Sequence, residues 1–350
     1  MLKSFRYLLL PLAFCYSAVI WVRNLLFDNN ILKSSSFNFP VIGVGNLAIG
    51  GTGKSPMVEY LVRLLKKDFK PATLSRGYKR KTTGFAIAGE NSTALEIGDE
   101  PMQFHLKFPD VTVAVGEERL VAIPQILHEQ PETEVIILDD AFQHRSVKPG
   151  LNILLSEYNN LYTRDFMMPA GDLRDIKGSS KRADIIIVTK CNPALTAKDK
   201  QSIVNELRLL PGQEVYFSAI AYGKPYHLFN KKKISILSTM HVLLLCGIAN
   251  PQQLKSFLTE AVQSYDMLRF PDHHIFHSND LAEIKKQFAI ISEKQKIILT
   301  TEKDAVRLIK FEPQLKEMPV YVLPISNHFL FKDEMKFNER ITGFVAGFKK

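Results

Sequence analysis

The sequence predicts an α/β protein whose sheets are mostly parallel and whose chain forms two domains. Short runs rich in valine, isoleucine and leucine alternate with stretches of helical apolar spacing, as in strands that helices cover on both faces. One such run leads into a glycine-rich loop and a helix. The length of 350 residues favours two domains over one.

The strand-like runs extend over most of the chain, at 39–44, 111–115, 134–138, 151–155, 184–188, 215–220, 242–245, 296–300 and 320–323. The stretch 222–238 has few core-forming residues and contains three consecutive lysines, so we place the domain junction there. The predicted organisation is an N-terminal helix (1–28), a nucleotide-binding domain (29–221), a linker (222–238), a second α/β domain (239–330) and a C-terminal tail that packs back (331–350).

The glycine-rich loop, Gly50-Gly51-Thr52-Gly53-Lys54-Ser55, is typical of a phosphate-binding loop. Its glycines let backbone N–H groups point at phosphate oxygens, Lys54 reaches the outer phosphates, and Ser55 can hold Mg²⁺. Ala48 stands where the usual pattern has its first glycine, but the preceding strand and the following apolar helix fit. A plain turn between strand and helix is the alternative, and a nucleoside triphosphate is the predicted ligand.

The segment Thr189-Lys190-Cys191-Asn192 ends another strand, where GTPases carry a motif that recognises guanine through a final aspartate. Asn192 offers only one acceptor oxygen in place of a carboxylate, so guanine selectivity is not favoured. ATP is therefore the predicted nucleotide.

Two carboxylates, Asp139 and Asp140, follow the buried run 134–138. Because the carboxyl ends of parallel strands face the ligand site, either could hold Mg²⁺ together with Ser55. The alternative is a turn or a helix cap.

Asp99 also lies just before a predicted helix, where it could act as a general base or simply cap that helix. His273 and His274 are adjacent, and the chain alone does not decide whether either of them is catalytic.

The net charge of +9 indicates an anionic partner, and the N-terminal segment indicates that this partner is a membrane surface. The stretch 8–22 is uncharged, contains aromatic residues and has basic flanks, which fits an amphipathic or monotopic membrane anchor. A buried N-terminal helix is the alternative, since fifteen residues are short for a span.

Nucleic-acid binding is not favoured, because basic and aromatic residues are not interleaved along the chain as such binding would need. Three scattered cysteines indicate neither a disulfide framework nor a zinc site.

Eight segments together resemble the tetraacyldisaccharide 4′-kinase (lipid A 4′-kinase) family and follow that family's order. They are Gly45-Asn46-Leu47 through Gly50-Gly51-Thr52-Gly53-Lys54-Ser55-Pro56, Ser75-Arg76-Gly77-Tyr78, Gly98-Asp99-Glu100-Pro101, Leu138-Asp139-Asp140-Ala141-Phe142-Gln143-His144-Arg145, Pro169-Ala170-Gly171-Asp172-Leu173-Arg174, Cys246-Gly247-Ile248-Ala249-Asn250-Pro251, Phe270-Pro271-Asp272-His273 and Thr301-Glu302-Lys303-Asp304-Ala305.

The resemblance implies a P-loop NTPase-like α/β/α domain and a smaller α/β/α domain, joined by a short two-stranded linker, with the active site between them. It implies transfer of the γ-phosphate of ATP to the 4′-hydroxyl of an acylated glucosamine disaccharide 1-phosphate, with Mg²⁺, at the cytoplasmic face of the bacterial inner membrane. No obligate protein partner and no nucleic acid are expected. The rival interpretation is a membrane-associated P-loop ATPase switch, which would turn over nucleotide without lipid.

The resemblance also assigns residues. It makes Asp99 the base for the 4′-hydroxyl, with His273 oriented against it, and Lys54 a catalytic group. Four side chains would contact substrate: Arg76, Gln143, His144 and Arg174. Asp139 and Asp140 would surround Mg²⁺, and Asp175, where the family usually has glutamate, is a further candidate ligand.

Overall fold

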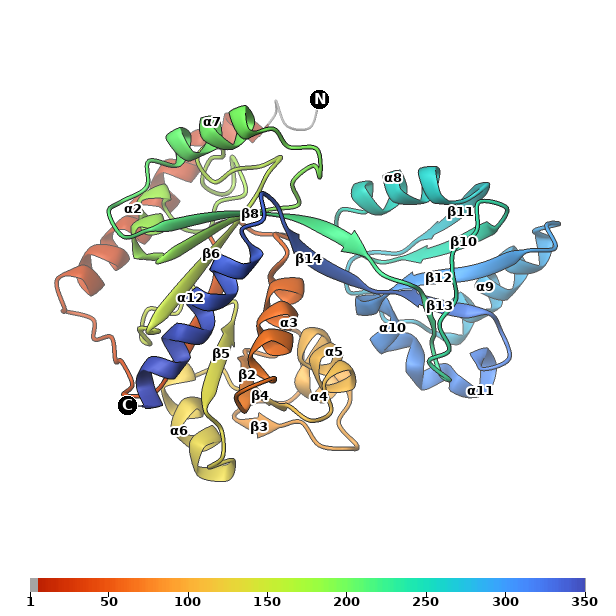
Figure 1. Ribbon diagram of the computed structural model, residues 1–350, viewed down its shortest axis with the longest axis horizontal. Coiled ribbons are helices and arrows are strands. Elements are labelled where there is room, and N and C mark those ends of the chain that lie inside the picture. The colour runs from red at the N-terminus through yellow and green to blue at the C-terminus, as the bar shows by residue number, and fades with distance from the viewer. Residues whose placement is uncertain (1–5, 350) are drawn as a thin grey trace.

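The computed structural model describes residues 6–349 and shows two lobes of unequal size (Figure 1). The larger lobe is built on a nine-stranded sheet and the smaller one on a five-stranded sheet. Each sheet has helices on both faces, which is the α/β/α layering expected for parallel strands that are apolar on both sides.

The larger sheet has the strand order β14-β8-β7-β6-β1-β5-β2-β4-β3. Its neighbouring strands are parallel except for the β8–β14 and β3–β4 pairs at the two edges. The strands are β1 (Val41–Asn46), β2 (Pro71–Ser75), β3 (Ala86–Ile87), β4 (Thr112–Val115), β5 (Val135–Asp139), β6 (Leu151–Glu157), β7 (Ile185–Thr189), β8 (Glu214–Tyr222) and β14 (Ile325–Phe329).

The helices of the larger lobe lie on opposite faces of this sheet. Apolar residues of α3 (Lys54–Leu65), α5 (Asp99–Lys107) and α12 (Glu334–Ala346) pack on one face. Those of α6 (Arg119–Glu129) and α7 (Ala197–Leu207) pack on the other. The short α4 (Ala94–Ile97) precedes α5. The chain therefore returns to the larger lobe at its C-terminal end.

The smaller sheet has the order β11-β10-β12-β13-β9, and only the short β9 runs antiparallel to its neighbour. Helix α8 covers one face, and α9 and α10 cover the other. The elements are β9 (Tyr226–His227), β10 (His241–Cys246), α8 (Gln252–Ala261), β11 (Ser264–Arg269), α9 (Ser278–Ile290), β12 (Lys296–Thr301), α10 (Glu302–Leu308), α11 (Glu312–Leu315) and β13 (Val320–Leu323).

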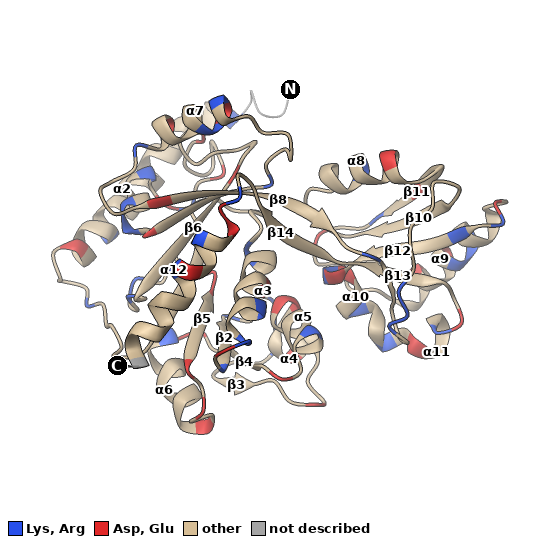
Figure 2. Ribbon diagram, viewed as in Figure 1, with Lys and Arg blue, Asp and Glu red and all other residues tan. Residues whose placement is uncertain are grey.

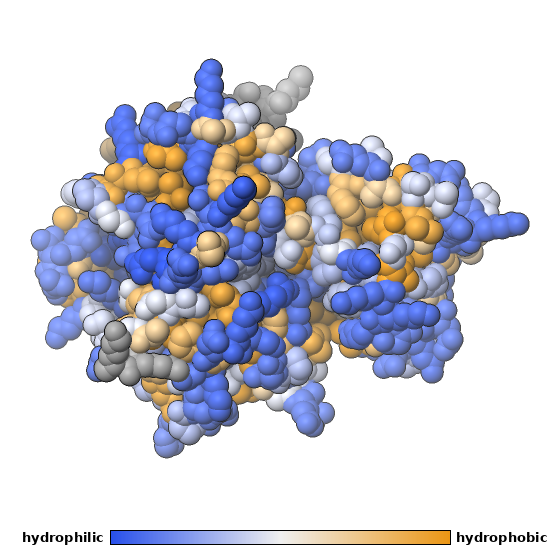
Figure 3. Space-filling view, in the orientation of Figure 1, coloured by the Kyte–Doolittle hydropathy of each residue, from blue (hydrophilic) through white to orange (hydrophobic). Residues whose placement is uncertain are grey.

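The chain crosses between the lobes twice, after β8 and before β14, and these two strands pair as far as Tyr222 and Ile325. The crossing coincides with the waist visible in Figures 1 and 3. Only the first residues of the predicted 222–238 junction lie at the crossing, because β9 already pairs with β13 of the smaller sheet. We expected the second domain to reach residue 330, whereas β14 belongs to the larger sheet.

The N-terminal helix α2 (Leu10–Asp28), preceded by a 3₁₀ turn (Tyr7–Leu9), lies on the outside of the larger lobe. Its large apolar side chains are mostly exposed, with Phe14 at 77% and Trp21 at 54%. By length and composition, residues 7–28 could cross a membrane. The alternative of a buried core helix does not hold.

Charged residues of both signs are interspersed over both lobes (Figure 2). The net charge of +9 is therefore spread over the protein and is not collected on one element.

Candidate active site

The glycine-rich loop connects β1, which lies between β5 and β6, to α3. Asn46, the last residue of β1, donates from Nδ2 to Thr52 Oγ1 (2.8 Å), and Thr189 Oγ1 donates to the Thr52 carbonyl (2.8 Å). Gly53 has φ +87°, a left-handed conformation that glycine adopts without strain, and it caps α3. Lys54 and Ser55 then form the first turn of α3, where helix N–H groups point outward.

Asp139 ends β5 directly beside the strand that leads into the loop, in register with Val44. Its side chain is buried, and within residues 6–349 its Oδ1 has no hydrogen-bond partner. Burial, together with the negative charge of Asp140, raises the pKa of Asp139 to about 7. A buried carboxylate oxygen without a partner is costly, so this position suits a bound cation such as Mg²⁺.

Asp140 adopts a left-handed conformation, with φ +50°, which turns its side chain toward Lys54 and Arg174. The Lys54 Nζ lies 3.6 Å from Oδ1, and Arg174 Nη1 donates to Oδ2 at 3.1 Å. Burial alone would raise the pKa of Asp140, but Lys54 and Arg174 outweigh it and lower the pKa to about 2. Asp140 is therefore ionised at neutral pH.

Asn46, to which the sequence analysis assigned no role of its own, links several of the predicted residues. Its side-chain oxygen accepts from Arg174 Nη2 (2.6 Å) and from Lys54 Nζ (3.4 Å). Its carbonyl accepts from Gln143 Nε2 (2.7 Å). Lys54, Gln143 and Arg174 thus converge on the end of β1.

His144 and Arg76 lie near this group. Burial, with the positive charges of Arg119 and Arg76, lowers the pKa of His144 to about 4, so this imidazole is neutral at physiological pH. Arg76 follows β2 and is exposed. The four predicted substrate residues therefore surround the carboxyl ends of β1, β2 and β5.

Asp175 does not face an open metal site. Its buried Oδ1 accepts from Asn24 Nδ2 of α2 (2.9 Å) and Ser179 Oγ (2.7 Å), and its Oδ2 accepts from Arg182 Nη2 (2.7 Å). Asp175, which we expected as a further candidate Mg²⁺ ligand, is thus engaged by Asn24 of α2 and by Ser179 and Arg182 of the segment Lys177–Arg182. We therefore assign Asp175 this structural role and not that of a metal ligand.

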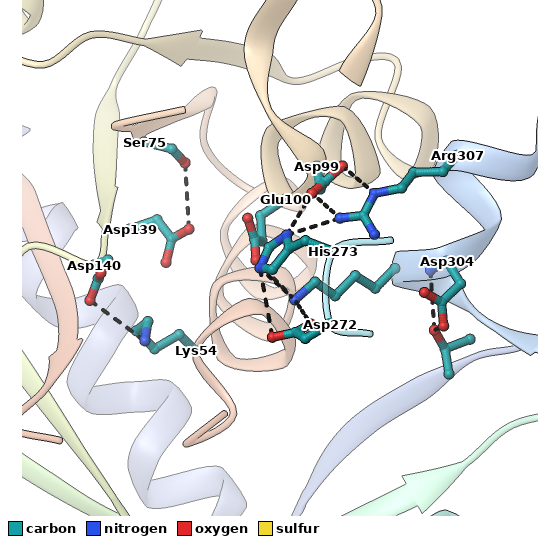
Figure 4. Close-up of polar contacts among 12 residues, drawn as sticks. Lys54, Ser75, Asp99, Glu100, Asp139, Asp140, Asp272, His273, Asp304 and Arg307 are labelled. Carbon is teal, nitrogen blue, oxygen red and sulfur yellow. Dashed lines mark hydrogen bonds and ion pairs between the residues drawn. The ribbon is translucent and has the colours of Figure 1, made fainter. Parts of the chain in front are cut away.

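Asp99 is the first residue of α5 and meets two residues of the smaller lobe (Figure 4). His273 Nδ1 lies 2.8 Å from Asp99 Oδ2, and Arg307 Nε donates to Oδ1 at 2.8 Å. Gly98 precedes Asp99 with φ +96°, and a Cβ there would lie 3.1 Å from the Gly77 backbone, so this start of α5 favours glycine.

His273 meets charged groups at both ring nitrogens. Its Nδ1 lies 2.8 Å from Asp99 Oδ2 and 2.9 Å from Arg307 Nη2, and its Nε2 lies 3.1 Å from Lys303 Nζ. Burial alone would raise the pKa of Asp99, but hydrogen bonds from His273 and Arg307 and the charge of Arg307 lower it to about 2. Asp99 is thus an ionised carboxylate of the larger lobe that is held by two side chains of the smaller lobe.

Sequence reasoning missed Arg307 and treated Lys303 only as part of a motif. Both lie on α10, four residues apart, and therefore on the same face of that helix. This spacing of four residues was the one sequence signal that could have linked Arg307 to the site, since Arg307 is 208 residues away from its partner Asp99.

A phosphate loop that runs from a central parallel strand into a helix, with an acidic pair on the adjacent strand, defines a P-loop phosphotransferase or NTPase. The second lobe adds His273, which pairs with Asp99 of the larger lobe. The family model described as tetraacyldisaccharide-1-P 4′-kinase matches residues 5–346. The chain belongs to this family.

Named relatives cover nearly the whole chain. The tetraacyldisaccharide 4′-kinase of Phocaeicola vulgatus is 45% identical over 346 residues, covering 96% of this chain and 94% of the relative. That of Flavobacterium johnsoniae is 45% identical over 343 residues, covering 97% of each. A crystal structure of LpxK from Aquifex aeolicus in complex with ATP is 29% identical, with a TM-score of 0.72, and covers 97% of this chain and 99% of that one.

Proposed function

We propose that this protein is a lipid kinase that transfers the γ-phosphoryl group of ATP to the 4′-hydroxyl of tetraacyldisaccharide 1-phosphate, forming lipid IVA in lipid A biosynthesis. Family membership supports the reaction. The observation that carries the assignment of residues is the pairing of Asp99 with His273 across the lobes, on a scaffold with a phosphate loop. The rival ATPase switch has no need of such a pair.

Asp99 is the base in this proposal even though its pKa is low. Phosphoryl transfer passes through a loose transition state in which the attacking hydroxyl keeps its proton until late, so orientation matters more than base strength. Each carboxylate oxygen has two acceptor sites, and Asp99 can therefore accept a hydroxyl while it is held by Arg307 and His273. Kinases commonly use an aspartate in this way.

The phosphate groups of ATP would bind along the loop 50–55. Backbone N–H groups of the glycines and of the first turn of α3 donate to phosphate oxygens, and Lys54 adds a positive charge at the outer phosphates. Ser55, Asp139 and Asp140 would hold Mg²⁺, whose chemical contribution is to neutralise charge on the transferring phosphoryl group. The partnerless oxygen of Asp139 supports this set.

The lipid headgroup would lie against the four residues around the strand ends. Neutral His144 and the amide of Gln143 suit sugar hydroxyls, because each can donate and accept hydrogen bonds. Arg76 is exposed and Arg174 half-buried, and guanidinium groups suit a phosphate on the disaccharide.

We also propose that α2 holds the enzyme at the cytoplasmic face of the inner membrane, in a peripheral or monotopic manner. It carries the exposed apolar residues Leu12, Phe14, Val19 and Trp21, and Leu8 of the preceding turn is exposed as well. Arg23, half-buried near the end of α2 and packed over Phe27, would place a positive charge close to acidic headgroups. Contacts of Asn24 and Tyr16 with the loop 174–179 hold α2 on the larger lobe.

Replacing Phe14 and Trp21 together by serine is expected to lower partitioning onto vesicles that contain anionic phospholipid by roughly tenfold or more, since each ring loses apolar area for burial. Co-sedimentation measures this. The matched control is Ile290→Ser, which removes an exposed apolar side chain (67%) from the smaller lobe. Unchanged sedimentation of the double variant would contradict the anchoring role.

The reaction itself is tested by transfer of ³²P from γ-labelled ATP to purified tetraacyldisaccharide 1-phosphate in detergent micelles. We expect labelled lipid, and little phosphate release when lipid is omitted. Release of phosphate without labelled lipid would overturn the kinase assignment in favour of the ATPase switch.

A further inference from the structure

Helix α5 of the larger lobe and helix α10 of the smaller lobe lie side by side and run in opposite directions. Asp99, which begins α5, pairs with Arg307 near the end of α10. Lys107, which ends α5, forms an ion pair with Glu302, which begins α10. The two lobes are thus joined at both ends of one helix pair, and only one of these ends is at the proposed site of chemistry.

The end away from Asp99 contains a hinge cluster, which we define as Glu59, Gln103, Lys107 and Glu302. Lys107 Nζ lies 2.6 Å from Glu59 Oε2 and also contacts Glu302 Oε1. Gln103 Nε2 donates to Glu59 Oε1 at 2.7 Å. One lysine of the larger lobe therefore bridges carboxylates of the two lobes.

The hinge cluster connects four structural elements. Glu59 lies on α3, the helix that starts at the phosphate-loop residue Lys54, and Gln103 and Lys107 lie on α5. Glu302 lies on α10, and its Oε2 accepts from the backbone N–H of Ile325 (3.2 Å), the first residue of the crossing strand β14. The phosphate-loop helix, the helix of Asp99, the smaller lobe and one crossing strand thus meet at one point.

Burial makes these contacts sensitive to the arrangement of the lobes. The side chains of Glu59 and Glu302 are 1% and 5% exposed. Burial and the charge of Glu59 raise the pKa of Glu302, and Lys107 opposes that effect. Removing one partner of a buried ion pair leaves an uncompensated charge, so the pair favours the arrangement that keeps its members together.

The length of α5 determines how far a movement at the Lys107–Glu302 pair would displace Asp99. Asp99 and Lys107 are eight residues apart, which corresponds to about 12 Å along a helix. A rotation of about 5° at the Lys107 end would displace the Asp99 end by about 1 Å, and such a displacement can cost up to about 10²-fold in rate.

We propose that Lys107 and Glu302 are positioning residues for phosphoryl transfer. By fixing α10 against α5 at the hinge cluster, they place His273 and Arg307 on Asp99. Neither side chain touches the reacting groups. This inference rests on the proposed role of Asp99 as the base.

The test is a double-mutant cycle with Lys107→Met and Glu302→Gln in the full-length protein, measured as ³²P transfer to lipid in micelles. Each single variant is expected to lower kcat by about tenfold with KM for ATP nearly unchanged, and the double variant is expected to lose much less than the product of the two. Lys107→Arg, which keeps the charge, should restore most of kcat. Lys66→Met, which breaks the exposed pair with Asp110 within the larger lobe, is the matched control and should retain wild-type kcat.

Thermal unfolding of each variant separates positioning from folding. Glu302→Gln retains an oxygen that can accept from Ile325 and leaves the Glu59–Lys107 pair intact, so its Tm should stay close to that of the wild type. Wild-type kcat in Glu302→Gln and Lys107→Met, or losses that simply multiply, would overturn the inference. Asp99→Asn is assayed alongside. If it remained active, the proposed role of Asp99 would fail, whereas an inactive Asp99→Asn beside fully active hinge variants would refute only the positioning role.

Discussion

Replacing Asp99 by asparagine is expected to lower kcat for lipid phosphorylation by about 10³-fold while KM for ATP changes little, which is the usual size of a lost general base. Asparagine has the same shape and still accepts a hydrogen bond, but it cannot take up the proton of the sugar hydroxyl. The phosphate loop lies on a separate part of the larger lobe, beside Asp139 and Asp140, so nucleotide binding should persist (Figure 4). Steady-state kinetics with varied ATP and saturating lipid measure both quantities.

Two controls make this result specific to Asp99. His273→Ala should also lower kcat, and the double variant should lose little more than Asp99→Asn alone, because residues that act as a unit are not additive. The asparagine variant leaves Arg307, which is 8% exposed, without its carboxylate, so its Tm must be compared with that of the wild type. A wild-type kcat in a folded Asp99→Asn variant would show that Asp99 is not the base and only caps α5.

The central strands could be predicted from sequence because burial on both faces demands uninterrupted apolar runs. All nine predicted runs correspond to strands, among them β1, β5 and β10. The missed strands lie at edges or carry polar residues. For example, β11 and β14 are the outermost strands of their sheets and include Asp266 and Asn327. β2 is buried inside the sheet, but it starts at a proline and carries the polar residues Thr73 and Ser75.

The candidate site divides in the same way between local and non-local features. The phosphate loop is one contiguous segment and the Asp139–Asp140 pair is another, and each directly follows a predicted strand. Their residue types and spacing therefore indicated their place at the strand ends. Arg307 and the hinge cluster depend on how the second lobe sits on the first, which no local pattern contains. Asp175 shows the opposite case, because its place in a motif suggested a metal while its actual partners are Asn24 of α2 and two residues of the segment 177–182.

Replacing Lys54 by methionine is expected to lower phosphoryl transfer by about 10³-fold or more, since a single cation that stabilises the transferring group in such enzymes has an effect of this size. Methionine keeps the length and the helix propensity of the first turn of α3 and removes only the charge. Asp140 keeps its partner Arg174, so the acidic pair should stay in place. The measurement is ³²P transfer to lipid in micelles.

Arg174, which shares Asp140 with Lys54, is already bound to Asp140 and Asn46 and so does not replace the charge of Lys54. KM for ATP should therefore rise together with the fall in kcat, in contrast to Asp99→Asn, where only kcat should fall. Lys66→Met, just beyond the end of the same helix, removes an equal charge outside the loop and should leave both parameters unchanged. Lipid labelling by Lys54→Met at the wild-type rate would show that the loop 50–55 does not hold the reacting phosphates.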